Sequence, residues 1–314
     1  MSAQTGMNTI RDFDLLVVGD LNADLILRGD VEPAFGQVEK LIDDATLTLG
    51  SSSAIFACGA ARLGLRVALV GKVGDDEFGR FMVREMNARG VNTESVVSDP
   101  QVKTGLTVIL SRGNDRAMLT YSGSIGALRL AEIDQALIAR ARHLHVASYF
   151  LLDALRPDIL ALFDLARSFG LTISLDTNYD PAEKWNGGLA DVLRRADVFL
   201  PNETELRAIA DIAETEAALH RLASGGLVVA AKLGVRGAMA QRGNERASAQ
   251  ALLVDVVDTT GAGDTFDAGF IYGYLAGWEL ARALRLACVC GSLSTRAAGG
   301  TTTQPTLAEA LEKL

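Results

Sequence analysis

Short apolar runs alternate with helical patterns along most of this chain. The first run is residues 14–19, Asp-Leu-Leu-Val-Val-Gly, and similar runs follow at 67–70, 145–147, 172–175, 198–200 and 227–231. Uninterrupted apolar runs of this length are typical of strands buried on both faces of a parallel sheet. Patterns with helical spacing lie between them, at 53–63, 77–89, 159–167 and 203–210. The alternation predicts an α/β fold: a doubly wound, mainly parallel sheet flanked by helices.

Two stretches interrupt this alternation. Residues 22–49 contain no convincing long helix, and residues 104–122 read as two strands, 105–111 and 116–121, joined by Arg-Gly-Asn-Asp. Such residues favour a hairpin turn. We expect a small β-sheet lid built from about 22–49 and 104–122, with a plain surface hairpin as the alternative. The lid would belong to a single domain over residues 14–314, preceded by a flexible segment, 1–12.

Composition excludes several classes of protein. With 49% hydrophobic residues among 314, the chain can bury a large core and is not mainly disordered. Its net charge of −9, from 39 acidic and 30 basic residues, disfavours nucleic acid and anionic membrane surfaces as partners. The first twelve residues lack the apolar core of a secretory signal, and the apolar stretch at 268–278 is too short to span a bilayer. We therefore expect a cytoplasmic protein.

One turn of small residues indicates a phosphate site. Asp258-Thr-Thr-Gly261-Ala-Gly263-Asp264 follows an apolar, strand-like segment (252–257) and precedes a helical pattern (264–276). Glycines allow a ligand to approach the backbone closely. At a helix N-terminus the N–H groups of Gly261, Ala262, Gly263 and Asp264 are free to bind an anion, and the helix dipole adds to the attraction.

Asp264 is unusual in this position because its carboxylate would repel an incoming phosphate. An acid there is useful if it accepts the proton of a hydroxyl that attacks the phosphate, as in a small-molecule kinase. The alternative is that Asp264 is only an acid that stabilises the first turn of the helix.

The Asp258–Asp264 string closely resembles the signature of the PfkB-type carbohydrate kinases, which belong to the ribokinase-like superfamily. Further blocks resemble the family's motifs in the family's order, so the resemblance covers about residues 14–303. These blocks are Gly19–Asp24, Gly50–Ser53 with Ala61–Gly64, Gly71–Gly79, Asp176–Asn178, Asn202–Glu205 and Lys232–Gly237. The resemblance implies a ribokinase-like fold and an enzyme that uses ATP and Mg²⁺ to phosphorylate a small sugar.

The resemblance also implies roles for single residues. Asp264 matches the catalytic base, and the amides of Gly261, Ala262 and Gly263 match an anion hole for the transferring phosphoryl group. Asn202 and Glu205 match residues that organise Mg²⁺, partly through water. Asn and Glu three residues apart also fit a plain helix start, with Asn as N-cap and Glu as its capping-box partner.

Other matched positions are ones at which the family binds its two substrates, the sugar and the nucleotide. Asn22 and Asp24, two apart on a strand, share one face and match residues that bind sugar hydroxyls, although both types are also common in turns. On the acceptor side we also expect Gly50, Ser51, Ile55 and Tyr149, of which Tyr149 is equally compatible with the core. Ile55 stands where the family often has Asn, so this side should be less polar.

The nucleotide side is expected to use Asn178, Lys232, Gly234, Gly237 and Thr259. Asp258 and residues 296–301 match a monovalent-cation loop of some members, so K⁺ is a candidate second ion.

Two other functions remain open. A nucleoside kinase of the same superfamily is possible because an apolar Ile55 permits a base to pack there. A non-catalytic sugar or nucleotide sensor is less favoured because Asp264, Gly261, Gly263, Asn202 and Glu205 are all present. A phosphosugar kinase would need a basic cluster for the substrate phosphate, and the hairpin segment offers only Arg112 and Arg116, with Lys103 just before it. An exposed sheet edge invites pairing, so we expect a homodimer through the lid.

Overall fold

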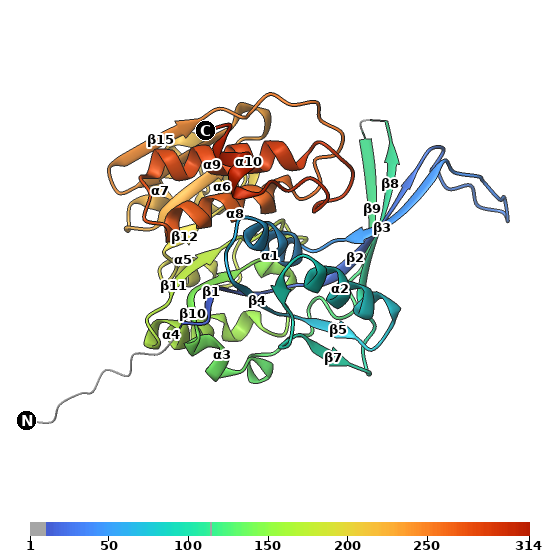
Figure 1. Ribbon diagram of the computed structural model, residues 1–314, viewed down its shortest axis with the longest axis horizontal. Coiled ribbons are helices and arrows are strands. Elements are labelled where there is room, and N and C mark those ends of the chain that lie inside the picture. The colour runs from blue at the N-terminus through green and yellow to red at the C-terminus, as the bar shows by residue number, and fades with distance from the viewer. Residues whose placement is uncertain (1–10, 114) are drawn as a thin grey trace, which may run out of the picture.

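A large, mostly parallel sheet forms the centre of the molecule (Figure 1). The computed structural model describes residues 11–113 and 115–314. Among these, nine strands lie in the order β15-β14-β13-β12-β11-β10-β1-β4-β6, and all adjacent pairs from β6 to β13 are parallel. The strands are β1 (Phe13–Val18), β4 (Val67–Val70), β6 (Val91–Asn92), β10 (Ala141–Val146), β11 (Thr172–Leu175), β12 (Val198–Phe199), β13 (Val228–Lys232), β14 (Ala238–Arg242) and β15 (Glu245–Ala249).

Helices cover both faces of this sheet, which confirms the doubly wound prediction. One face is covered by α1 (Ser52–Arg62), α2 (Glu77–Ala88), α8 (Ala262–Leu275), α9 (Leu280–Ser294) and α10 (Leu307–Leu311). The other is covered by α3 (Gln135–Ala139), α4 (Ile159–Ser168), α5 (Leu189–Leu193), α6 (Glu203–Ala210) and α7 (Thr215–Ala223). Leu15 and Val17 pack into the first layer, and Leu16 and Val18 pack into the second. Both faces of β1 are therefore buried, which explains its uninterrupted apolar run.

A second, smaller sheet projects from the body (Figure 1). Its order is β3-β2-β8-β9, with β2 (Asn22–Arg28), β3 (Asp44–Leu49), β8 (Gly105–Arg112) and β9 (Asp115–Tyr121). The predicted small sheet is thus present, and β8–β9 is half of it rather than an isolated hairpin. Within the predicted hairpin turn, Asn114 lies outside the described residues.

Short elements complete the chain. β5 (Lys72–Gly74) pairs with β7 (Val97–Asp99). The 3₁₀ turns of the described residues are η1 (Leu130–Glu132), η2 (Tyr149–Leu151), η3 (Arg156–Asp158) and η4 (Gly234–Arg236). Of the segment expected to be flexible, residues 1–10 lie outside the described part, whereas Arg11 Nη2 donates to the carbonyl of Phe169 (2.5 Å). The single-domain division stays a prediction.

The strand expected at 252–257 is absent. The amides of Val257 and Asp258 both donate to the carbonyl of Thr295 (2.8 and 3.1 Å), and the Leu252 amide donates to Ser292 Oγ (3.0 Å). These donors therefore bond to α9 and the residue after it instead of to a neighbouring strand. The segment is apolar for another reason: it lines a cavity against α8 and α9.

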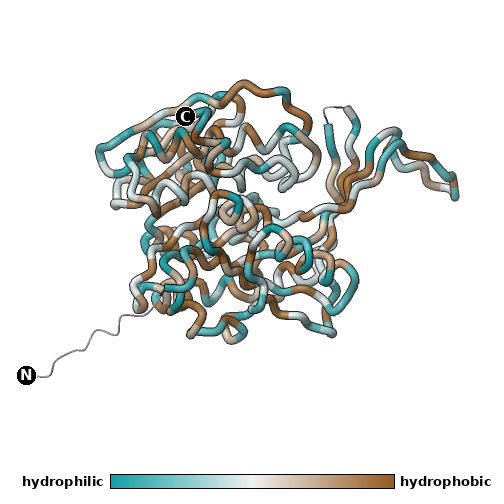
Figure 2. The backbone as a smooth tube through the Cα atoms, in the orientation of Figure 1, coloured by the Kyte–Doolittle hydropathy of each residue, from teal (hydrophilic) through white to brown (hydrophobic). Residues whose placement is uncertain are grey.

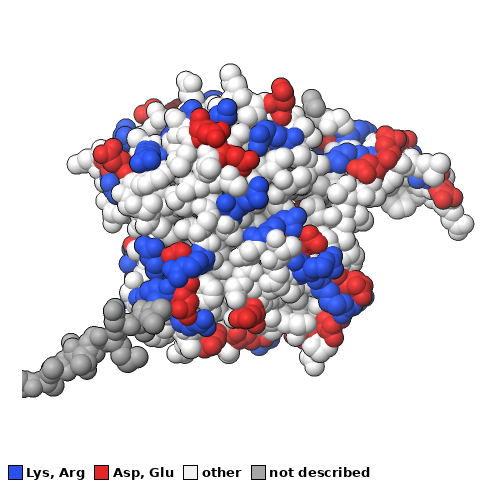
Figure 3. Space-filling model, in the orientation of Figure 1, with Lys and Arg blue, Asp and Glu red and all other residues white. Residues whose placement is uncertain are grey.

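The surface and the interior differ as the composition predicts. Apolar residues run through the body and along the small sheet (Figure 2), but Leu253, Val256 and Val257 form an exposed apolar stretch. Basic and acidic side chains are interspersed on the face seen in Figure 3. No helix in the described residues is long and apolar enough to cross a membrane.

Candidate active site

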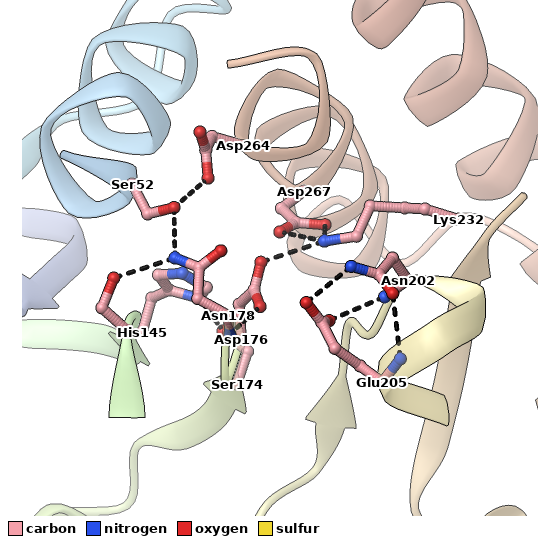
Figure 4. A network of polar contacts seen from close by, with 11 residues as sticks. Ser52, His145, Ser174, Asp176, Asn178, Asn202, Glu205, Lys232, Asp264 and Asp267 are labelled. Carbon is pink, nitrogen blue, oxygen red and sulfur yellow. Dashed lines mark hydrogen bonds and ion pairs between the residues drawn. The ribbon is translucent and has the colours of Figure 1, made fainter. Parts of the chain in front are cut away.

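The polar side chains of the site gather where the parallel strands end. Asp20 follows β1, Asp176 follows β11, Asn202 follows β12 and Lys232 ends β13. The carboxyl ends of parallel strands share one edge of a sheet, where α/β proteins bind their ligands. The N-terminus of α8 points to the same edge, which brings Asp264 to this group (Figure 4).

The small-residue turn starts α8 two residues earlier than predicted. Gly261 is the N-cap, with a left-handed φ of 72°. A Cβ there would lie 2.7 Å from Gly300 Cα and 2.8 Å from Ile55 Cγ2, so glycine is required both by conformation and by space.

Three of the four predicted free amides remain free. The prediction is wrong for Ala262, whose N–H closes a turn on the carbonyl of Thr259 (3.2 Å). Within the described residues, the N–H groups of Gly261, Gly263 and Asp264 have no acceptor. They form an open helix N-terminus of the kind that binds phosphate.

Asp264 is a partly buried carboxyl group. Its Oδ1 accepts a hydrogen bond from Ser52 Oγ (2.5 Å). Burial raises the pKa of Asp264 to about 7, while the hydrogen bond from Ser52 acts in the opposite direction. A carboxyl group with a pKa near neutrality is well matched to take up a proton.

Lys232 forms a buried ion cluster beneath this helix end (Figure 4). Its Nζ lies 2.9 Å from Asp176 Oδ2 and 2.9 Å from Asp267 Oδ2. Burial alone would lower the pKa of Lys232, but the two carboxylates raise it above its ordinary range. Burial raises the pKa of Asp267 well above its usual value. The sequence analysis missed Asp267, although its spacing from Asp264 puts both acids on one side of an otherwise apolar helix.

Asn202 and Glu205 form the capping box that was the structural alternative for this pair. Asn202 Oδ1 accepts the Glu205 N–H (2.9 Å), Glu205 Oε2 accepts the Asn202 N–H (2.9 Å), and the Asn202 side-chain amide donates to Glu205 Oε1 (2.6 Å). Burial, with Asp176 nearby, raises the pKa of Glu205 to about 7. The carboxylate and amide oxygens of this pair are ligand types that Mg²⁺ prefers, and each oxygen keeps a second lone pair for a metal-bound water.

Asn22, Asp24 and Gly50 lie together at the base of the small sheet. Asn22 Nδ2 donates to Asp24 Oδ1 (2.9 Å) and to Thr107 Oγ1 (3.3 Å). Burial, with Asp20 nearby, raises the pKa of Asp24 to about 7. A Cβ on Gly50 would lie 2.1 Å from Asp24 Oδ1, so Gly50 makes room for this pair.

Three of the residues expected to bind the acceptor substrate point into the protein interior. Ser51 caps α1, accepting the Ala54 N–H (3.0 Å) and donating to the Asp20 carbonyl (2.6 Å). Ile55, 3% exposed, packs beneath Gly261. Tyr149 is 1% exposed and its hydroxyl donates to the carbonyl of Gly187 (2.6 Å), so its core alternative is the one observed.

A cavity of about 400 Å³ lies beside the N-terminal turns of α8 and against α9. Four of the residues expected to bind the nucleotide line it: Lys232, Gly234, Gly237 and Thr259. Apolar walls missed by the sequence analysis come from Leu252, Val254 and Phe266. Asn178 is not among the lining residues; its side chain instead faces Ser52 and Ser148.

Asp258 joins the two halves of the expected cation loop. Its Oδ1 accepts from the amide and hydroxyl of Thr260 (2.9 and 2.7 Å), and its Oδ2 accepts the Gly299 N–H (3.0 Å). Arg116 reaches this turn from β9 and donates to Thr260 Oγ1 (2.9 Å).

Known proteins that are similar to this chain are carbohydrate kinases. Residues 12–307 match the pfkB family carbohydrate kinases. An ATP-dependent ribose-1-phosphate kinase of Halopiger xanaduensis is 32% identical over 89% of this chain and 91% of its own. A 5-dehydro-2-deoxygluconokinase of Bacillus velezensis is 28% identical over 97% and 95%.

The fold agrees as well. A putative ribokinase II from E. coli, solved in complex with ATP and Mg²⁺, superposes with a TM-score of 0.85 at 23% identity, over 96% of this chain and 98% of that one. With the family match spanning nearly all described elements, the chain belongs to the pfkB family of carbohydrate kinases and is a phosphotransferase that uses ATP to phosphorylate a sugar hydroxyl.

Proposed function

We propose that Asp264 is the general base that deprotonates the attacking sugar hydroxyl. The observation that carries this proposal is the position of its carboxyl group, in the first turn of α8 beside the free amides of Gly261 and Gly263. A hydroxyl placed between Asp264 and a phosphate on those amides would lose its proton to Asp264 as it attacks. The amides would stabilise the charge that develops on the phosphoryl oxygens.

The cavity against α8 and α9 is the proposed nucleotide site. Its apolar walls suit a base, and its lining also includes Gly263 and Lys232, which lie next to each other. Asn202 and Glu205 would hold Mg²⁺ through water. When bound, this ion neutralises charge on the phosphates. A K⁺ ion at the Asp258 loop stays a proposal.

The acceptor site is proposed at Asn22 and Asp24, whose amide and carboxylate suit the hydroxyls of a sugar. The case for a nucleoside was the apolar Ile55, but that side chain packs beneath Gly261 and is not available to a base. A sugar is therefore the favoured acceptor. The named relatives act on a sugar phosphate and, by name, a dehydro-deoxygluconate, so both belong in the substrate panel.

The test is ADP release with Mg·ATP against free sugars, sugar acids, sugar phosphates and nucleosides. We expect one sugar class to give a strong signal. Asp264→Asn should reduce kcat by about 10²- to 10⁴-fold, the usual value of a general base. Near-normal turnover in this variant would rule out Asp264 as the base, and a nucleoside as the best acceptor would rule out the sugar assignment.

The small sheet is proposed to act as a lid and as a dimer interface. On the face that carries Leu25 and Val108, an apolar row crosses all four strands in register, Leu47–Leu25–Val108–Leu119. Leu119 is 61% exposed and Leu47 39%. A second copy of the same sheet would cover this row. The cytoplasmic location and the absence of nucleic-acid and membrane partners stay predictions.

A further inference from the structure

A chain of hydrogen bonds ends on the carboxyl group of Asp264 (Figure 4). Ser52 Oγ donates to Asp264 Oδ1 (2.5 Å), and Asn178 Nδ2 donates to the same Ser52 oxygen (2.5 Å). The other hydrogen of Asn178 Nδ2 goes to Ser148 Oγ (2.9 Å). Asp264 on α8, Ser52 on α1, and Asn178 and Ser148 after two strands of the sheet thus form one continuous chain of hydrogen bonds, which we call the relay.

The chemistry of the groups sets the direction of this relay. A serine hydroxyl has one hydrogen, and an amide nitrogen has two. Both hydrogens of Asn178 Nδ2 are used, so the Ser52 oxygen accepts from Asn178 and its only hydrogen is directed at Asp264. Asp264 Oδ1 is thereby held, while Oδ2 has no hydrogen-bond partner among the described residues.

Two residues of the relay, Asn178 and Ser148, have a strained backbone conformation. Asn178 has a φ of 52° and Ser148 a φ of 57°, both in the left-handed region that residues other than glycine seldom adopt. The Asn178 N–H is fixed further by Asp176 Oδ1 (2.9 Å). Such strain persists where the surrounding structure requires it, and it is concentrated at functional sites.

We propose that Ser52 and Asn178 are positioning residues that orient the Asp264 carboxylate, leaving Oδ2 directed at the acceptor hydroxyl. This inference rests on the proposed function of Asp264 as the base. Ser52 and Asn178 act through Asp264 and need not touch either substrate.

The electrostatics of Asp264 agree with this role. Burial and the carboxylates of Asp20 after β1 and Asp176 after β11 raise its pKa, whereas the Ser52 hydroxyl on α1 and Lys232 on β13 lower it. Asp267, on α8 itself, also has a carboxyl oxygen within 4.8 Å of Asp264. Removing the hydroxyl should therefore raise the pKa of Asp264. The acid limb of the pH dependence of kcat/KM should then move to higher pH.

The test compares Ser52→Ala with Ser52→Thr, which keeps a hydroxyl. We expect Ser52→Ala to lower kcat by about 10- to 100-fold, the value of a hydrogen bond to a charged group. KM for ATP should be unchanged and the acid limb shifted upward, and Ser52→Thr should restore most of the activity. Ser168→Ala removes a serine hydroxyl on α4, outside the site, and is the matched control. Unchanged kcat and an unmoved acid limb in Ser52→Ala would overturn the proposal.

A double-mutant cycle tests the order of the relay. Asn178→Gly removes the side chain while tolerating the left-handed backbone. Because Asn178 acts through Ser52, it should cost much less in a Ser52→Ala background than alone. Fully additive losses would contradict the relay.

The two proposals fail in different ways. If Asp264→Asn stays active, the base assignment is wrong. If Asp264→Asn is inactive while Ser52→Ala and Asn178→Gly both turn over normally, only the relay is wrong.

Discussion

At the scale of single residues, the site depends on one buried cation shared by two buried acids. Lys232 Nζ contacts Asp176 and Asp267 at 2.9 Å each, and the three side chains come from β13, the end of β11 and α8. Asp267 lies three residues after Asp264 on the same helix. The cluster therefore links the sheet edge to the helix that carries the proposed base.

Lys232→Met should destabilise the protein strongly. Removing one partner of a buried ion cluster leaves uncompensated buried charge, which costs about 3–5 kcal/mol in the free energy of unfolding. Without Lys232, both acids would have folded-state pKa values above their unfolded value, so the loss should grow as pH rises above about 4 and shrink on acidification. Urea unfolding at pH 5 and pH 8 measures this.

Lys40→Met is the matched control, since Lys40 pairs with Asp30 at the surface. It should leave the unfolding midpoint almost unchanged. An equal loss in Lys232→Met at both pH values would contradict the charge explanation.

At the scale of elements, the position of α8 depends on close packing against α9. Gly269 and Gly273 lie on the α8 face that meets α9. A Cβ on Gly273 would lie 2.7 Å from Ala283 Cβ and 2.8 Å from Ala283 Cα, too close for a real contact. These glycines let the two helices approach, and the approach places Gly261–Asp264 at the sheet edge.

Gly273→Ala should therefore lower the free energy of unfolding by about 1–3 kcal/mol, as overpacking of a core does. Thermal or urea unfolding measures the change. Gly225→Ala is the control, because no atom lies within 4 Å of its added Cβ and its φ is not positive. Equal stability of the two variants would show that α8 and α9 are not in close contact at this point.

At the scale of the whole molecule, no other part of the chain that the structure describes covers the apolar face of the small sheet. Tyr121, 53% exposed, lies on the same face as Leu119, since each pairs with an alternate residue of β8. A monomer would expose this row to water, and a dimer would bury it.

Light scattering should find a dimer for the natural sequence and a monomer for Leu119→Lys, because a buried ammonium group would oppose association. Leu311→Lys, on exposed α10, should remain dimeric. A monomeric natural sequence would refute the interface.

Local sequence determined most of the strands and helices and the turn that carries Asp264. Runs such as 67–70 and 172–175 form strands with those bounds, and the Asp258–Asp264 turn starts a helix, because both patterns depend on near neighbours. Only the tertiary structure decided which side chains meet. Ser52 and Asp264 are 212 residues apart, so no local pattern indicates their hydrogen bond. Tyr149 and Ile55 were expected at the acceptor site, but both are buried against residues distant in sequence. The segment 252–257 lines a cavity instead of forming a strand. Its amides at Leu252 and Val257 donate hydrogen bonds to Ser292 and Thr295, at the end of α9, and not to a neighbouring strand. Periodicity and turn chemistry are local, whereas the partner of a buried polar group is selected by the packing of the whole chain.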